Sequence, residues 1–231
     1  MRVRVGFTPA EEVAGSLGIV IDVLRATSTI CQALASGYEQ VVCVAEIDDA
    51  RALAGDGVAL AGERHNVLID GFDFGNSPRE FLEPPSRRRL VMTTTNGTRL
   101  MLAAAERCET VLVASLLNLD AVVAAARESG AGEIAVLCAG VEGTFAIDDA
   151  YVAGRIAGML GGEPDDAAIA AIRLAGTFES AEEGIASGDS AQNIRNAKLD
   201  DDIPWCARES VLELVPRVVE RAAGSVTIAA A

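Results

Sequence analysis

Short apolar runs rich in valine, isoleucine and leucine recur along the first 160 residues, and segments with helical spacing separate them. Strands are predicted over residues 2–8, 18–23, 40–45, 58–62, 90–94, 110–115 and 133–139. Helices are predicted between them, ending near Gly37, Ala54, Arg107, Ser129 and Leu160. Strands that alternate with helices through short connections are typical of a parallel sheet covered on both faces. The pattern predicts an α/β fold with three layers, α/β/α, and a mainly parallel sheet.

The pattern changes after Gly162. A helix is predicted over residues 164–178, broken helix over 179–202, and extended segments over 211–220 and 225–230. Pro216 cannot donate to a strand ladder, so it predicts an edge position for the first of these segments. We expect one domain over residues 1–231, which could divide into two lobes, 1–162 and 163–231, the second with edge or antiparallel strands.

The predicted strand Gly18–Val23 contains an acid at its end, Asp22, and a helix follows at once. A guanidinium and three hydroxyls stand at the helix start, on Arg25, Thr27, Ser28 and Thr29. Free amides at a helix start, together with such side chains, form a site for an anion. A carboxylate beside a phosphate needs a cation between them, so the stretch indicates a divalent metal. The alternative is a helix cap next to an ordinary surface aspartate.

Other predicted strands also end in polar residues: Glu63, the turn Thr95–Thr98, Ser115 with Asn118, and Gly140 with Asp148 and Asp149. Ligands bind outside the carboxyl ends of the strands in sheets of this kind. Acids from three strands could hold one Mg²⁺, which prefers oxygen ligands. We therefore expect a metal and phosphate site at this edge.

Residues 64–88 show no regular period and carry Gly, Asn, Asp and Pro at short intervals. A long irregular segment inside a compact domain is usually functional, so we interpret it as a binding loop, with an interdomain linker as the alternative. His65, the only histidine, could act as a general acid or be a solvated loop residue.

Composition limits the partners. The formal charge is −15, from 19 Lys and Arg against 34 Asp and Glu, which disfavours nucleic acid and anionic membranes. No apolar run is long enough to span a bilayer, and no signal peptide is evident. Five isolated cysteines are typical of buried thiols in a reducing cytoplasm. Their spacing and the single histidine argue against structural zinc, which leaves hard cations such as Mg²⁺.

Several catalytic motifs are absent. The chain lacks the P-loop pattern and the G-x-S-x-G elbow, which disfavours ordinary nucleotide hydrolysis and serine hydrolase chemistry. Thr144 stands where a cysteine phosphatase loop starting at Cys138 would need arginine. Leu24 stands where an aspartate phosphatase of D-x-D type would need its second acid after Asp22.

Six segments in this order resemble the ComB family, the 2-phosphosulfolactate phosphatases: VIDVLRATSTI, GERH, GFDFGNSP, TTTNGT, SLLN and CAGVEGTFAIDDAYVAG. The resemblance covers nearly the whole chain. It implies a Mg²⁺-dependent phosphatase that converts 2-phospho-3-sulfolactate to sulfolactate and phosphate on a route towards coenzyme M. It also implies an α/β fold distinct from the better-known phosphatase superfamilies.

The matching motif positions are Asp22, Arg25, Thr27, Thr29, Gly62, Glu63, Gly71, Phe72, Gly75, Asn76, Ser77, Pro78, Asn96, Gly97, Thr98, Asn118, Gly140 and Asp149. Where the family often has Glu-Asp, this chain has Asp148-Asp149, so Asp149 is the preferred ligand. Ala146 stands where a serine is common. The C-terminal part matches loosely, through Ser187, Asp202-Ile203, Cys206 and Pro216.

We expect Asp22, Arg25, Glu63 and Asp149 to be catalytic, with Asp22, Glu63 and Asp149 as ligands of Mg²⁺ or as base; whether Asp22 is instead a nucleophile stays open. Expected substrate contacts are Thr27, Ser28, Thr29, Arg64, Asn76, Ser77, Asn96, Gly97, Thr98, Asn118 and Gly140. Arg64, Arg79 or Arg99 could pair with a sulfonate or carboxylate. The expected partner is a small anionic phosphorylated substrate, and a homodimer is a further expectation. The alternatives are a non-catalytic sensor of such anions, or a phosphatase acting on another small acid.

Overall fold

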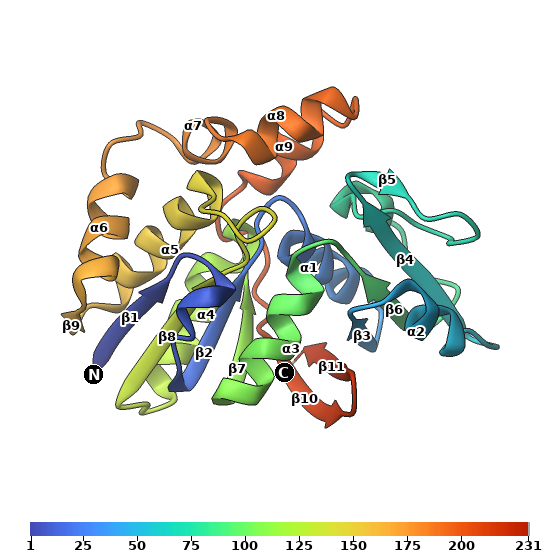
Figure 1. Ribbon diagram of the computed structural model, residues 1–231, viewed down its shortest axis with the longest axis horizontal. Coiled ribbons are helices and arrows are strands. Elements are labelled where there is room, and N and C mark those ends of the chain that lie inside the picture. The colour runs from blue at the N-terminus through green and yellow to red at the C-terminus, as the bar shows by residue number, and fades with distance from the viewer. Residues whose placement is uncertain (231) are drawn as a thin grey trace.

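The computed structural model describes residues 1–230, and its strands form one sheet in the order β5-β4-β6-β3-β11-β10-β7-β2-β8-β1-β9 (Figure 1). The strands are β1 (Arg2–Gly6), β2 (Gly15–Ile21), β3 (Gln40–Val44), β4 (Val58–Arg64), β5 (Val67–Leu68), β6 (Arg89–Thr93), β7 (Cys108–Ala114), β8 (Glu133–Cys138), β9 (Glu163–Pro164), β10 (Pro216–Ala222) and β11 (Ser225–Ala230).

The α-helices are α1 (Ala26–Ser36), α2 (Ile47–Ala52), α3 (Gly97–Arg107), α4 (Leu119–Glu128), α5 (Ile147–Leu160), α6 (Asp166–Ala175), α7 (Ala181–Ala186), α8 (Asp189–Asn196) and α9 (Asp202–Cys206). Short 3-10 turns lie at Pro9–Glu11, Pro78–Phe81 and Leu116–Asn118. No helix of the described part of the chain is both long and apolar enough to cross a bilayer.

Strand β2 is buried on both faces, as its nearly continuous apolar run predicts. Ile19 and Ile21 belong to a hydrophobic cluster with residues of α4, α5 and α6. Val20, between them, belongs to a second cluster with residues of α1 and α3. Because successive side chains of a strand point to opposite faces, helices cover both sides of this strand. The predicted α/β fold with a mainly parallel sheet is confirmed.

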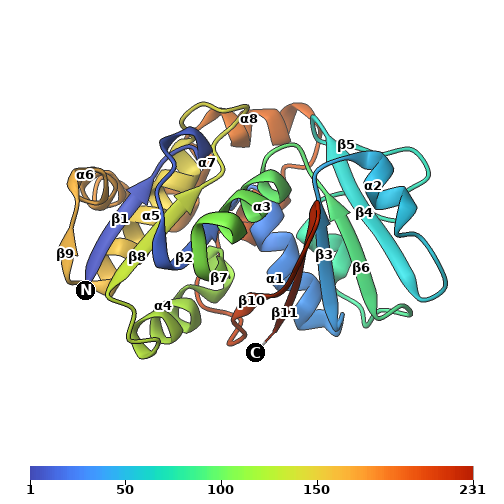
Figure 2. The same ribbon diagram turned by 60° about the horizontal axis from the view of Figure 1, so that its bottom comes forward.

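The sheet consists of two parallel blocks joined by an antiparallel hairpin. One block is β4-β6-β3 and the other is β7-β2-β8-β1, each parallel within itself. The hairpin β10–β11 lies between the blocks in Figures 1 and 2, with β11 antiparallel to β3 and β10 antiparallel to β7. The C-terminal segment is therefore antiparallel, as expected, but it fills the centre of the sheet.

The edge position predicted from Pro216 is wrong. Pro216 is the first residue of β10, where a missing N–H is tolerated. The ladder between β10 and β7 contains a single pair, Arg217 with Leu112, so the strand needs few donors on that side. The guanidinium of Arg221 adds bonds to the carbonyls of Cys108 and Glu109, at 3.0 and 2.7 Å. The side chain of Arg221 thus strengthens the contact between β10 and β7, in which the backbone forms only one ladder pair.

Part of the segment 64–88 is regular. Strand β4 continues to Arg64 and pairs with β5, so residues 63–68 form a hairpin that periodicity did not reveal. Its turn residues, His65 and Asn66, both have positive φ, at 52° and 63°. Two positive φ values are what a two-residue hairpin turn of type I′ requires. This turn projects side chains toward the cavity described next.

Candidate active site

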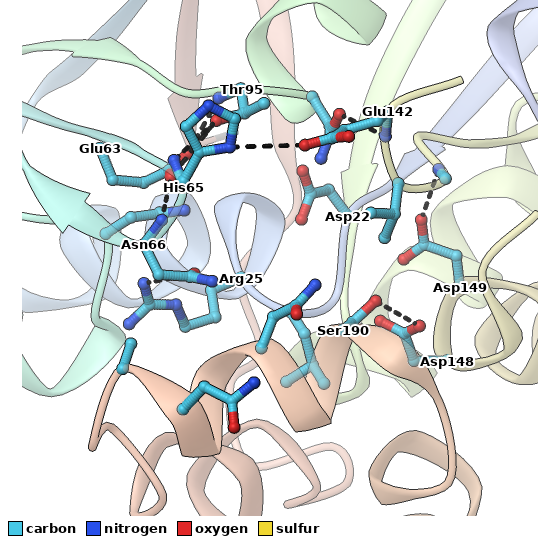
Figure 3. A pocket seen from close by; sticks show the side chains of 18 of the residues that line it. Asp22, Arg25, Glu63, His65, Asn66, Thr95, Glu142, Asp148, Asp149 and Ser190 are labelled. Atoms are coloured by element: carbon cyan, nitrogen blue, oxygen red, sulfur yellow. Dashed lines mark hydrogen bonds and ion pairs between the residues drawn. The ribbon is translucent and has the colours of Figure 1, made fainter. Parts of the chain in front are cut away.

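A cavity of about 430 Å³ opens where strands of both blocks end (Figure 3). Its lining includes Asp22 after β2, Glu63 in β4, Thr95 and Asn96 after β6, and Gly140 after β8. Further lining residues come from the hairpin turn, from α5 and from α8: His65, Asn66, Asp148, Asp149, Ser190, Asn193 and Asn196. The predicted convergence of polar strand ends is therefore observed for four strands. The end of β7, with Ser115 and Asn118, does not reach the cavity.

Asp22 binds the start of helix α1, whose N-cap residue is Arg25. The Ala26 amide donates to Asp22 Oδ1 at 3.1 Å, and the Thr27 hydroxyl donates to the Asp22 carbonyl at 2.9 Å. The expectation that Thr27, Ser28 or Thr29 caps the helix is wrong, because all three lie inside α1. Their hydroxyls bond to the backbone instead, Ser28 to the Val23 carbonyl and Thr29 to that of Asn76. They hold the loop in place without lining the cavity.

Gly97 allows helix α3 to approach Asp22. A Cβ atom at Gly97 would lie 2.5 Å from Asp22 Oδ2 and 2.5 Å from the Cβ of Ala26, closer than real Cβ contacts. Only a residue without a side chain fits there. Gly97 is therefore needed for the close packing of α3 on the Asp22 loop, a different reason from the substrate contact expected from the sequence.

The two acids at the start of α5 occupy the wall next to Asp22. Asp149 accepts the Val23 amide on Oδ1 at 2.9 Å and the Gly140 amide on Oδ2 at 3.0 Å. It thus ties the ends of β2 and β8 together. Asp148 Oδ1 accepts the Ser190 hydroxyl at 2.9 Å, which links this wall to α8.

Glu63 lies on the opposite wall, with Asp22 between it and Asp149 in Figure 3. Its Oε1 accepts the Thr95 amide at 2.9 Å and its Oε2 accepts the Asn66 amide at 2.7 Å. Within residues 1–230, no three acid, histidine or cysteine side chains are close enough to hold one metal ion. The acids Asp22, Glu63 and Asp149 therefore line one cavity but do not enclose a shared metal position. Glu63 instead fixes the hairpin turn.

Burial of the acids changes their ionisation. Loss of hydration, with the charges of Asp148 and Glu63 nearby, raises the pKa of Asp22 to about 7. Burial raises the pKa of Asp148 to about 6. The pKa of Asp149 lies well above its usual range because of burial and the charges of Asp148 and Asp22. The negative charge of these buried acids is therefore not fully neutralised by the other residues of this wall.

This charge predicts how stability depends on pH. In the unfolded chain these acids lose their protons near pH 4, whereas in the folded protein Asp22 and Asp148 keep them to about pH 7 and 6. The folded state binds more protons in that interval, so its free energy of unfolding falls as pH rises from 4 to 7. We expect Tm without metal to be several degrees lower at pH 8 than at pH 5.5. Differential scanning fluorimetry measures Tm at each pH. Mg²⁺ should raise Tm more at pH 8 than at pH 5.5. An equal increase in Tm at the two pH values would contradict this prediction.

Arg25 forms a buried ion pair with a residue from the C-terminal segment. Its Nη1 donates to Asp202 Oδ2 at 2.5 Å, and both side chains are 1% exposed. The Ser77 hydroxyl donates to Asp202 Oδ1 at 2.6 Å, and Arg25 Nη2 donates to Asn66 Oδ1 at 3.1 Å. The loosely matching C-terminal segment thus helps to build the site. Sequence spacing could not reveal this, since 177 positions separate Arg25 from Asp202.

The remaining predicted contacts have other positions. Arg64 donates to backbone carbonyls of Glu63 and Ala45, and Asn118 donates to the carbonyl of Val113. The hydroxyl of Thr98, in the first turn of α3, donates to the carbonyl of Thr94, which lies before the helix. Arg79 pairs with Asp201, and Arg99 pairs with Glu46. Of the expected substrate-binding residues, Asn76, Asn96 and Gly140 line the cavity, and the others do not: Thr27, Ser28, Thr29, Arg64, Ser77, Gly97, Thr98 and Asn118.

Several lining residues were not predicted from the sequence: Asn66, Glu142, Ser190, Asn193 and Asn196. His65 was considered, and its Nδ1 lies 3.4 Å from Glu142 Oε1 across the cavity mouth. The turn at Asn66 could have been predicted from the sequence, because asparagine tolerates the positive φ that a hairpin turn requires. The three residues of α8 could not have been predicted, since they come from a polar helix whose sequence has no distinctive spacing.

The donor set fits a divalent cation that is shared with a bound ligand. Mg²⁺ is usually held by one or two carboxylates, with waters and substrate phosphate as its other ligands. Asp22 and Asp149 offer carboxylate oxygens on neighbouring parts of the wall, and each oxygen that accepts one amide retains a second lone pair. A cation there would also offset the buried negative charge.

Comparison with known proteins identifies the family of this chain. Residues 5–221 match the family model described as 2-phosphosulpholactate phosphatase. A protein of Thermus thermophilus named "Probable 2-phosphosulfolactate phosphatase" is 38% identical over 222 residues, which cover 94% of each chain. A protein of the same name from Symbiobacterium thermophilum is 38% identical over 229 residues, covering 94% of this chain and 97% of the relative. The chain therefore belongs to the 2-phosphosulpholactate phosphatase family.

Proposed function

We propose that this protein is a Mg²⁺-dependent phosphatase that hydrolyses the phosphate monoester of a small anionic hydroxy acid, 2-phospho-3-sulfolactate, to sulfolactate and phosphate. The observation that carries the proposal is one cavity in which buried acids face a buried arginine. The names of the relatives support the substrate. The acids favour catalysis over simple anion binding, because a pure anion receptor gains nothing from negative walls.

Asp22 and Asp149 would hold the Mg²⁺. When bound, the ion would neutralise charge on the phosphate and on the ester oxygen that leaves. Glu63 is not included, because it lies on the opposite wall from Asp149 and no three acids of the described residues are close enough to share one ion. The ligand set proposed here is therefore smaller than the one expected from the sequence.

The other side chains would position the substrate. Arg25 donates N–H groups to phosphate oxygens, and its Nε is buried without a hydrogen-bond partner in the described structure. The side-chain oxygen of Asn76 is likewise buried without a partner, and as an acceptor it would take a hydrogen bond from a protonated oxygen or a bound water of the ligand. Asn96 and the backbone at Gly140 lie beside the same space. Charge-assisted hydrogen bonds of this kind are about twice as strong as neutral ones.

Asp148 would accept the proton of the attacking water. The Ser190 hydroxyl fixes its Oδ1, and no strand end depends on it, in contrast to Asp149. The water oxygen forms the new bond to phosphorus, the bond from phosphorus to the ester oxygen breaks, and that oxygen takes up a proton from solvent while Asp148 returns the proton of the attacking water to solvent. The products are the free hydroxy acid and inorganic phosphate.

Release of inorganic phosphate tests the proposal. Purified protein is incubated with 2-phospho-3-sulfolactate, phospholactate and p-nitrophenyl phosphate, with Mg²⁺ or with EDTA. We expect turnover of the sulfonated substrate with Mg²⁺ and at least about tenfold less with EDTA. Faster turnover of another phospho-acid would change the substrate, and tight anion binding without turnover of any compound would identify a sensor.

A further inference from the structure

The strongest unexplained feature near the cavity is the buried carboxylate of Asp202. It lies in the first turn of α9 and does not line the cavity. Both of its oxygens have partners, Arg25 on Oδ2 and Ser77 on Oδ1. It is therefore available neither to substrate nor to metal, and its effect must pass through one of these partners.

A buried ion pair needs a reason other than stability. Removing two charges from water costs about as much as their attraction returns, and apolar residues of similar size often stabilise a core more. Here the pair lies at the edge of a cavity, and one of its members, Arg25, lines that cavity. A fixed orientation of the guanidinium is a benefit that an apolar pair could not provide.

The charges around Arg25 show what Asp202 prevents. Four buried acids line the same cavity: Asp22, Glu63, Asp148 and Asp149. Among the described lining residues, Arg25 is the only lysine or arginine. A guanidinium stays protonated at any working pH, so without Asp202 it would be drawn to the nearest acid in the cavity. Such a contact would fill the space that an anion needs.

We propose that Asp202 is a positioning residue: it holds Arg25 away from the cavity acids and presents the remaining N–H groups of the guanidinium to the phosphate. Ser77 completes the arrangement by fixing the second oxygen of Asp202. Asp202 engages Nη1 and Asn66 engages Nη2, while Nε has no partner in the described structure. This inference rests on the proposed function for the identity of the ligand, a phosphate group.

The Asp202→Asn variant tests the proposal. Asparagine keeps the shape of the side chain and can still bond to Arg25 and Ser77, but it removes the charge. Titration calorimetry with inorganic phosphate and Mg²⁺ measures both Kd and the number of sites per chain. We expect Kd to rise at least about tenfold, since the bond to Arg25 loses the charge of its acceptor, with the number of sites unchanged. A purely structural residue would reduce the number of sites and leave Kd unaltered, and that result would overturn the proposal.

Two further variants complete the test. Ser77→Ala releases one oxygen of Asp202 without changing any charge, so Kd should rise about threefold or more. If Asp202→Asn does not fold, an unchanged Kd in Ser77→Ala overturns the proposal. Glu209→Gln is the matched control, because it breaks an ion pair with Arg155 outside the cavity, and Kd should stay at the wild-type value. An equal rise in this control would also overturn it.

Phosphate binding keeps this test separate from the proposed function. If the wild-type protein binds phosphate but releases none from any phospho-acid, the catalytic proposal fails. The comparison of Kd between the wild type and Asp202→Asn remains valid in that case, since it requires no turnover.

Discussion

Replacing Asp22 with asparagine is expected to lower kcat/KM for phosphate release at least about a hundredfold, because outer-shell partners of a metal alone are worth 10- to 100-fold. Asp22 stands between the two walls of the cavity, and Asn would remove its charge while keeping the acceptor for the Ala26 amide. The hydrogen bond to the first amide of α1 should therefore remain. Steady-state kinetics with and without Mg²⁺ measure the loss.

Stability should change in the opposite direction to activity. Burial raises the pKa of Asp22 to about 7, so its ionised form is unfavourable in the metal-free protein at pH 8. We expect Asp22→Asn to have a Tm at pH 8 that is equal to or higher than that of the wild type. Asp56→Asn is a suitable control, because this exposed acid lies outside the cavity and its loss should affect neither quantity. Near-normal turnover by Asp22→Asn would refute the site.

The second large effect is expected from Gly97→Ala. The new methyl group would meet Asp22 Oδ2 and the Cβ of Ala26, each at 2.5 Å. Overpacking of this kind costs about 1–3 kcal/mol of unfolding free energy, and a displacement of about 1 Å in a reacting group can cost a hundredfold in rate. We expect Tm to fall by a few degrees and kcat to fall about a hundredfold. Kinetics and thermal unfolding measure both.

Gly55→Ala provides the matched comparison for this substitution. Gly55 lies in an exposed turn, and nothing lies within 4 Å of the added methyl group. It changes the same residue type without a clash, so kcat should not change. If Gly97→Ala retained wild-type kcat, α3 would not be required to pack so closely on the Asp22 loop.

The parallel strands were predictable because they are buried on both faces. Their apolar runs and the polar residues after them follow directly from that environment, as Val20 in β2 and Asp22 beyond it show. The place of β10 was not predictable from Pro216. Proline excludes only positions that need its N–H, and the sheet uses one backbone pair between β10 and β7. Strand order depends on such tertiary contacts.

The site likewise has features that the sequence predicts and features that it does not. Asp22, Arg25, Glu63 and Asp149 could be identified as residues of one cavity from their positions after strands and in motifs. The role of each residue could not be predicted, because it depends on hydrogen bonds formed in the fold. Two amides bind Glu63, whereas Arg25 is held by Asp202. Contacts over more than a hundred positions leave no local pattern in a single sequence.

The central hairpin also bears on how the protein folds. Glu63 and Thr95 belong to one block and Asp22 and Asp149 to the other, and β10–β11 is the ladder that joins the blocks. In a chain emerging from the ribosome, β3 at residues 40–44 must therefore wait for residues 225–228 before its second edge is paired. Such distant pairings raise the contact order and slow the search for the native state. The cavity is thus completed late, when β10 and β11, which are synthesised after the other strands of this sheet, pair with both blocks.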